Sequence, residues 1–466
     1  MSLDLLTRRA ELRNVVTMAV PVVITTSSRA LMDVVDYAMI ASLDLEAAQA
    51  AILPAQLIMW SYIVMGMGTV SLVSTFAAQA MGKGRYRECS GYAWQGVYVA
   101  ILVGILAVAA RPMLPALIAL MGHAPAVQDL EIAYTHVALL TTGPTVAAAA
   151  LGWFFIGIHR PWVTTWSVIE ANVINFAVSA VLIFGYLGFE PMGIAGAAWG
   201  TLVGVSYRAV RLMFALLLPS VDETFCSRST WKPSWAKIKQ VLRYGLPAGL
   251  HWVSEVAVWA IFINILVGAK FGTVHLVATN TAWQYMRIGF MPMLGMSQAL
   301  TALVGKSIGA GNPERAMRET RYAAIITMTY LGILSTIYVI FRHELIAIFN
   351  DDPVVVDIGG GIMTCAAVFQ LFDALGITYD GALRGAGDTF IPAVFMVAST
   401  WIVLIGVAWW IVGAYPELGS LGPWLAATAL IAITAIFLCW RWHSRAWMKI
   451  NVFAATPESE EPEPAV

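Results

Sequence analysis

Charged residues are scarce in this sequence. Asp, Glu, Lys and Arg make up 12% of its 466 residues, which is about half the share found in soluble globular domains. Hydrophobic residues make up 59%. That is more apolar surface than one globular core buries, so lipid must form a large part of the solvent around this chain. The formal net charge is −1, and this near balance excludes the basic field that would recruit nucleic acid.

Cysteine is also rare. The four cysteines lie far apart, and their spacing matches neither a disulfide framework nor a metal site. We therefore expect them to be unlinked packing residues, and we expect no cofactor. They are Cys89, Cys226, Cys365 and Cys439.

Long apolar runs dominate instead. A helix needs about 20 apolar residues to cross the core of a bilayer, and twelve stretches of this sequence reach that length. Each is predicted to be a transmembrane helix, which makes the chain an all-α polytopic membrane protein. The predicted spans are 15–40, 50–80, 91–119, 130–155, 161–187, 192–218, 241–269, 276–305, 322–349, 356–382, 390–414 and 420–443.

The Lys and Arg residues predict an orientation. With the N-terminus in the cytoplasm, 22 of the 27 lie on the cytoplasmic side. Cytoplasmic loops of membrane proteins carry such an excess, so both termini are predicted to be cytoplasmic and the protein to lie in the cell inner (plasma) membrane. The remaining five are Arg111, Lys270 and Arg342 on the outer side, with Arg29 and Arg287 inside spans.

The two halves of the chain match each other at a nearly constant offset. Pro21 in the first span corresponds to Pro247 in the seventh, an offset of 226. Glycines follow the same rule at offsets of 226 to 228, after the second and eighth spans, after the fourth and tenth, and before the sixth and twelfth. They are Gly82 and Gly84 with Gly309 and Gly311, Gly157 with Gly385, and Gly193 and Gly196 with Gly419 and Gly422.

Six spans in each copy give both copies the same orientation. The sequence therefore predicts two six-helix bundles related by a pseudo-two-fold axis along the membrane normal. The predicted parts are an N-lobe (1–218), a cytoplasmic linker (219–240), a C-lobe (241–445) and a partly disordered cytoplasmic tail (446–466). Parallel repeats of this kind suit alternating access, in which two similar lobes rock about a cavity.

Ionisable residues inside the spans are the functional candidates, because a charge at the bilayer centre costs at least about 2.5 kcal/mol. Carboxylates can bind a proton or offer hard oxygen ligands to a small cation, and Asp36, Glu255 and Asp373 lie within spans. Arg29 and Asp33 are one helical turn apart, where either an ion pair or a functional role is open. The candidates for lining a substrate cavity are Arg29, Asp33, Gln284 and Arg287.

Four stretches have distinctive glycine or charge patterns. They are GALRGAGDTFIP (381–392), TALVGKSIGAGNPERA (301–316), AAQAMGKG (77–84) and VVDYAMIASL (34–43). Together they resemble motifs of the multidrug and toxic compound extrusion (MATE) family of transporters, and the bacterial NorM-like type in particular. The resemblance covers nearly the whole chain and implies two six-helix bundles around a central cleft.

The resemblance also implies roles for single residues. Asp36 takes the position of the family's acidic residue in the first helix. Glu255 and Asp373 resemble the C-lobe carboxylate pair of sodium-coupled members, so the three are predicted cation-coupling residues and the pair a predicted Na+ site. Two departures stand out: Ser179 occupies a place where many members have an aspartate, and Arg29 occupies the place of Glu255 in the other half.

The predicted function is therefore a cation-coupled antiporter, driven by Na+ or H+, that exports small organic cations as a monomer. Its expected partners are a small-molecule substrate, the coupling cation and membrane lipid. The alternative on the same fold is a flippase or exporter of a lipid-linked or anionic substrate, which Arg29 and Arg287 favour. An integral membrane enzyme is disfavoured, because the DVVD run at 33–36 has no second aspartate-rich motif beside it.

Overall fold

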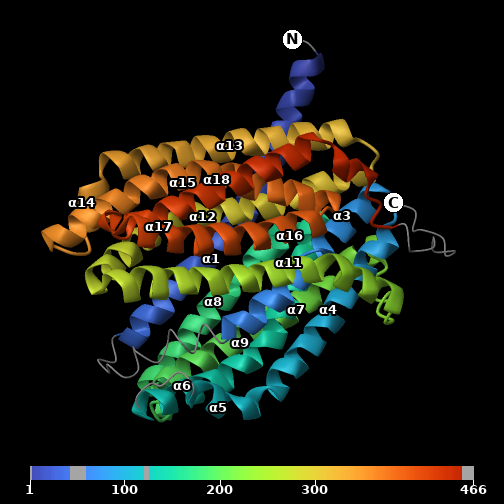
Figure 1. The fold of residues 1–466 in the computed structure, drawn as a ribbon. Helices are drawn as coiled ribbons and strands as arrows, with labels where there is room; N and C mark the ends of the chain where they lie inside the picture. The colour runs from blue at the N-terminus through green and yellow to red at the C-terminus, as the bar shows by residue number, and fades with distance from the viewer. Residues whose placement is uncertain (1–2, 42–58, 120–124, 454–466) are drawn as a thin grey trace. The chain divides into compact units, whose positions relative to one another are not determined.

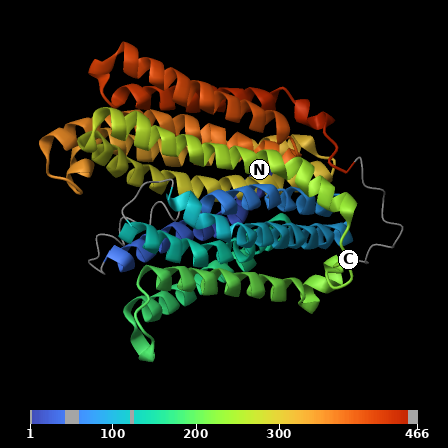
Figure 2. The ribbon, with the colours of Figure 1, turned by 60° about the horizontal axis from the view of Figure 1, so that its bottom comes forward.

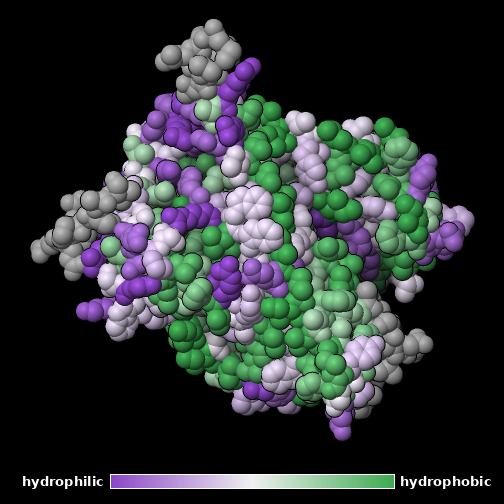
Figure 3. Space-filling view, turned by 180° about the vertical axis from the view of Figure 1, so that it is seen from behind, coloured by the Kyte–Doolittle hydropathy of each residue, from purple (hydrophilic) through white to green (hydrophobic). Residues whose placement is uncertain are grey.

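The computed structural model describes residues 3–41, 59–119 and 125–453, and every regular element in these ranges is helical (Figure 1). Large apolar side chains remain exposed along many of the helices. In the space-filling view they form broad hydrophobic areas between smaller polar patches (Figure 3). Such a surface fits lipid rather than water.

Eleven helices in the described ranges are long and apolar enough to cross a bilayer. A bent pair, Ile194–Leu216 with Pro219–Phe225 at 59°, supplies the twelfth. Each predicted span falls on one of these helices, so the all-α, twelve-span prediction is confirmed. The eleven are Arg8–Asp36, Met59–Gly82, Tyr86–Ala119, Val127–Gly157, Pro161–Phe184, Trp235–Ala269, Thr273–Gly309, Pro313–Ile340, Pro353–Ala386, Phe390–Ala414 and Leu421–His443.

Proline often begins these helices, at the first position where its missing N–H costs no hydrogen bond. Pro161 and Pro353 are examples. The helices are α1 (Leu3–Ala41), α3 (Val73–Gly82), α4 (Tyr86–Ala109), α5 (Leu114–Ala119), α6 (Pro125–Ala138), α7 (Thr142–Gly157), α8 (Pro161–Phe184), α9 (Ile194–Leu216), α10 (Pro219–Phe225), α11 (Trp235–Ile261), α12 (Thr273–Gly309), α13 (Pro313–Ile340), α14 (Arg342–Ala347), α15 (Pro353–Ala386), α16 (Phe390–Ser399), α17 (Ala408–Ala414) and α18 (Leu421–His443).

The chain forms two compact units. Unit 1 comprises Met1–Val23, Leu250–Ile308 and Asn312–Asn451, and unit 2 comprises Ile24–Gly249, Gly309–Gly311 and Val452–Val466. The predicted lobes were divided at the linker 219–240, whereas the units are divided inside α1 and inside α11. The start of α1 belongs to unit 1 because the carboxylate of Glu11 there pairs with Arg318 of α13 at 2.7 Å.

Unit 1 is built around α15, which packs against α13 and α18 (Figure 1). The glycine-rich stretch at the end of α15 joins it to two neighbours. The Oγ1 of Thr301 on α12 donates to the carbonyl of Gly381 at 2.8 Å. Asp388, which is 3% exposed, pairs with Arg441 of α18 at 2.8 Å. This stretch therefore has a structural role in the packing of unit 1.

Unit 2 contains two tightly packed helix pairs, α8 with α9 and α4 with α7. The green pair α8 and α9 lies side by side in Figure 2. The last described residue, Phe453, also belongs to this unit and is 4% exposed. Its ring packs edge-on against Phe76 and Tyr92, and the Lys83 ammonium lies 4.6 Å from its centroid. The C-terminal end of the described chain is thus anchored in unit 2.

The internal repeat is visible in the backbone. Gly84 and Gly311, which correspond in the repeat, both have positive φ, at 75° and 70°. Gly193 and Gly419 share a conformation open to few other residues, with φ of 53° and 55° and ψ of −130° and −141°. The predicted correspondence of these glycines therefore extends to their geometry.

Close helix packing repeats in the same way. A Cβ at Gly157 of α7 would lie 2.8 Å from the carbonyl oxygen of Ser74. A Cβ at Gly385 of α15 would lie 2.6 Å from the carbonyl oxygen of Thr301, the counterpart of Ser74 in the repeat. Equivalent helices approach each other at equivalent points in the two units, as small residues allow in membrane proteins.

Candidate functional site

The acid pair, Glu255 of α11 and Asp373 of α15, lies within unit 1. Asp373 is 9% exposed and Glu255 is half-buried. The two carboxyl groups are close enough for the charge of Glu255 to act on Asp373. Two carboxylates in one site repel when both are ionised, so such a pair favours a shared proton or a bound cation.

The register of α11 and α15 explains why these carboxyl groups meet. One turn after Glu255 stands Trp259, and one turn before Asp373 stands Phe369. Their ring centroids are 6.2 Å apart. In an antiparallel pair of helices a contact at that point brings Glu255 and Asp373 to the same level one turn away. The sequence identifies both acids, and the helix packing joins them.

Aromatic rings continue from this point into unit 1. Trp259 lies 4.8 Å from Trp283 and 5.3 Å from Phe262, measured between ring centroids. Phe262 packs in turn on Trp424, and both are fully buried. Trp259 and Trp283 are only partly buried. The acid pair is thus bordered by π faces that can accept a cation.

Gln370 was missed in the sequence and belongs to the same face of α15, three residues before Asp373. Its side chain is 2% exposed, and its Nε2 donates to the carbonyl of Met286 at 3.2 Å. A Cβ at Gly289 would lie 2.7 Å from that Nε2, so the glycine makes room for the amide. The Oε1 of Gln370 is buried and has no hydrogen-bond partner in the described parts of the chain.

The other cavity candidates of the C-terminal half lie on α12. Gln284 is exposed and Arg287 is half-buried. Trp283, the residue before Gln284, is the one that packs against Trp259. Across the described residues, no group of three or more His, Cys, Asp or Glu side chains could hold a metal ion.

A polar seam joins α1 to α8 in unit 2. Thr25 donates to Thr165 at 3.0 Å, and Asn172 donates to the hydroxyl of Ser28 at 2.9 Å. Further along both helices, Asn175 donates to Asp36 at 3.3 Å. Residue numbers increase on both helices from one contact to the next, so α1 and α8 run parallel.

Ser179 extends this seam by one more turn of α8. Its hydroxyl donates to the Oδ1 of Asn175 at 2.8 Å, and Asn175 in turn donates to Asp36. Ser179, which replaces an aspartate of the family that the chain resembles, is therefore connected to Asp36 through the side-chain amide of Asn175. The side chain of Asp33, the other predicted acid of α1, lies outside the described residues.

Two arginines, Arg29 of α1 and Arg208 of α9, lie near each other in unit 2 and are called here the arginine pair. The charge of Arg29 acts on Arg208. The guanidinium of Arg29 lies 5.1 Å from the ring centroid of Trp60. The Nε of Arg208 is buried without a hydrogen-bond partner among the described side chains and backbone. A Cβ at Gly152 would lie 3.3 Å from its Nη2.

Arg208, one of the 22 cations predicted to lie on the cytoplasmic side, lies inside α9, eight residues before the helix ends at Leu216. At 1.5 Å per residue this is about 12 Å from the helix end. It therefore falls within the predicted span 192–218, in the half nearest the linker.

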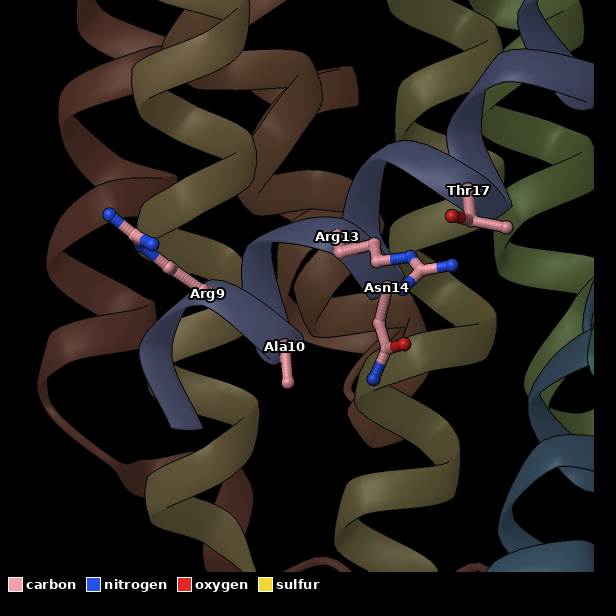
Figure 4. A pocket seen from close by; sticks show the side chains of 5 residues that line it. All are labelled: Arg9, Ala10, Arg13, Asn14 and Thr17. Atoms are coloured by element: carbon pink, nitrogen blue, oxygen red, sulfur yellow. The ribbon is translucent and has the colours of Figure 1, made fainter. Parts of the chain in front are cut away.

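A groove of about 510 Å³ lies along the beginning of α1, within unit 1. It is lined by Arg9, Ala10, Arg13, Asn14 and Thr17. Figure 4 shows the side chains of Arg9 and Arg13 extending from the helix in different directions. All five residues come from this one helix, and none belongs to the acid pair or the arginine pair.

Known proteins resemble this chain over both of its halves. The MatE family model matches residues 21–181 and 247–410. The two matches begin at Pro21 and Pro247, the same two prolines that set the internal repeat. The probable multidrug resistance protein NorM of Rhizobium meliloti is 29% identical over 399 residues, covering 84% of this chain and 85% of that protein.

Solved structures share the fold. A crystal structure of MATE in the straight conformation matches with a TM-score of 0.85 at 21% identity, over 94% of this chain and 97% of that one. A transporter of the MOP superfamily from Pyrococcus furiosus matches with a TM-score of 0.82 at 20% identity, over 96% and 97%. These likenesses show that the three chains share one fold.

Proposed function

This chain belongs to the MatE family, and we propose on that basis that it is a cation-coupled antiporter exporting small organic cations by alternating access. The observation that carries the proposal is the acid pair, Glu255 and Asp373, set beside aromatic rings in unit 1. The names of two bacterial relatives, both probable multidrug resistance proteins, support an export role.

The acid pair supplies the coupling chemistry. A Na+ ion between the two carboxylates, or one proton shared by them, removes their mutual repulsion. The buried Oε1 of Gln370 on the same face of α15 is a third hard oxygen. Oxygen atoms are the ligands that small hard cations prefer. We therefore favour Na+ as the coupling ion, with Glu255, Asp373 and Gln370 as the candidate ligands.

The rings beside the acid pair suit an organic cation. Trp259 and Trp283 are only partly buried, so their faces can contact an aromatic ammonium compound through cation–π attraction. Export then follows if ion binding and substrate binding favour opposite-facing or mutually exclusive states. We further propose that the protein acts as a monomer in the plasma membrane, with both termini in the cytoplasm.

Efflux from reconstituted vesicles tests the proposal. Purified protein is reconstituted with a cationic rhodamine dye, and efflux is compared under an imposed Na+ gradient and an imposed H+ gradient. The neutral replacements Glu255→Gln and Asp373→Asn should abolish gradient-driven efflux while leaving the amount of protein unchanged. Asp357→Asn is the matched control, because Asp357 is an exposed acid on the same helix, α15. Normal ion-dependent efflux by both variants would refute the acid pair as the coupling site.

A further inference from the structure

The two units differ in charge at equivalent positions. Arg29 of α1 and Glu255 of α11 are separated by the same offset as Pro21 and Pro247. Thr145 of α7 and Asp373 of α15 are separated by the same offset as Gly157 and Gly385. Where unit 1 has its two carboxyl groups, unit 2 therefore has a guanidinium and a hydroxyl. The repeat conserves the fold and reverses the sign of the charge.

A second cationic side chain adds to the positive charge of unit 2 at this place. Arg208 of α9 lies near enough to Arg29 for the two positive charges to repel. The Nε of Arg208 is buried and has no hydrogen-bond partner in the described ranges. An arginine kept in this state inside a membrane helix is costly unless something compensates its charge.

The nearby described carboxylates have other partners. Glu170 of α8 pairs with Arg211 at 3.2 Å and accepts a hydrogen bond from Tyr207 at 2.9 Å. Asp36 accepts from Asn175 at 3.3 Å. Among the described residues, no carboxylate forms an ion pair with Arg29 or Arg208. The compensating charge is therefore missing from the described protein groups.

Guanidinium groups are well suited to hold an oxyanion, since their planar N–H donors match carboxylate and phosphate oxygens in bidentate geometry. Trp60 lies against Arg29 and restricts its position. The Nη2 of Arg208 lies close against Gly152, where a Cβ would approach it to 3.3 Å, so the glycine gives this guanidinium its place. Two positioned guanidinium groups near one another form a receptor for one anionic group.

We propose that the arginine pair in unit 2 is a binding site for an oxyanion, a carboxylate or phosphate group carried by a solute or by a lipid. The site shares no residue with the acid pair of unit 1 and requires no part of the cation-coupled mechanism. A bound oxyanion neutralises both arginines at once and removes their repulsion.

Binding of two dyes with the same ring system tests the site. Fluorescein is anionic near neutral pH, and a rhodamine whose carboxyl group is esterified is its cationic counterpart without a carboxylate. Binding of each to purified full-length protein in neutral detergent is measured by fluorescence polarisation. Arg29→Ala and Arg208→Ala should each weaken fluorescein binding by about tenfold or more, the scale expected for the loss of a hydrogen bond to a charged group. Rhodamine binding should remain.

Arg211→Ala is the matched control, because Arg211 lies one turn after Arg208 on α9 but is paired with Glu170. It should leave fluorescein binding unchanged. Glu255→Gln and Asp373→Asn should also leave it unchanged, which separates this site from the acid pair. Retained rhodamine binding by the arginine variants shows that they are folded.

A second arm identifies the source of the oxyanion. The protein is placed in nanodiscs of phosphatidylcholine, with and without phosphatidylglycerol. One outcome is that phosphatidylglycerol lowers fluorescein binding to the wild type and leaves unchanged the weak binding that the arginine variants retain. In that case the site takes a lipid phosphate. If it does not compete, the site takes a soluble anion. Fluorescein binding that is equal in the wild type and in both arginine variants would overturn the proposal.

Discussion

The packing of α15 against α12 gives a quantitative prediction through two glycines on the same helix. In Gly385→Ala the new Cβ would lie 2.6 Å from the carbonyl oxygen of Thr301 and 3.0 Å from the Cβ of Val304. In Gly376→Ala the nearest atoms would be those of Ala435, at 3.7 Å. The first replacement forces two helices apart, whereas the second makes an ordinary van der Waals contact.

The size of the stability difference follows from two effects of replacing glycine by alanine. Replacing glycine inside a helix gains about 1 kcal/mol of helix propensity, and this gain is shared by both variants. Overpacking a closed contact costs about 1–3 kcal/mol, and it applies only to Gly385→Ala because its obstacle is backbone. The propensity gain cancels in the comparison. Gly385→Ala should therefore be less stable than Gly376→Ala by about 1–3 kcal/mol.

Thermal unfolding in detergent measures this difference. Both variants are purified under identical conditions, and the Tm of each is compared with that of the wild type. We expect Gly376→Ala to melt at or above the wild-type temperature and Gly385→Ala to melt below Gly376→Ala. A Tm for Gly385→Ala equal to or above that of Gly376→Ala would show that α15 and α12 do not approach as closely as described.

Three further outcomes are expected. In a background without the four native cysteines, a cysteine at Glu417 should react with an impermeant maleimide in intact cells and one at Lys239 should not; the reverse pattern would invert the proposed orientation. Asp388→Asn should lower the Tm more than the double change with Arg441→Gln, because a single change leaves a buried charge unpaired; a larger loss in the double variant would argue against that pairing. Phe453→Ala should cost about 3–5 kcal/mol as a buried aromatic truncation, visible as a lower Tm; an unchanged Tm would mean that its packing in unit 2 adds little.

Much of the fold could be predicted because lipid imposes simple rules on a sequence. Apolar length identified the spans, and glycine spacing identified the repeat. The shared positive φ of Gly84 and Gly311 shows why that spacing carried information: glycine enters that region of φ without the steric cost that other residues meet. Helix ends were less accurate. The predicted ninth span began at 322, whereas α13 begins at Pro313, where the capping side chain of Asn312 sets the helix start.

The candidate site was only partly predictable. Glu255 and Asp373 were identified because charges are rare in spans, but the register that joins them depends on Trp259 packing against Phe369. Gln370 carries no charge and gave no signal. Arg208 entered the sequence analysis only as one of the cytoplasmic cations, because a charge count does not use the burial of a side chain. The burial of its Nε depends on neighbouring helices, which no local pattern encodes.

The interleaved composition of the two units has a consequence for biosynthesis. Unit 1 contains residues from the very beginning of the chain and from near its end, and unit 2 is completed by Val452 and Phe453. The segment Met1–Val23 leaves the ribosome long before α13, the helix that holds Glu11 through Arg318, has been translated. Neither unit can be finished during synthesis of its own half. If the protein is expressed as two separate fragments divided within 219–240, each fragment therefore lacks a segment that completes its unit. Each unit becomes complete only when the other fragment supplies that segment.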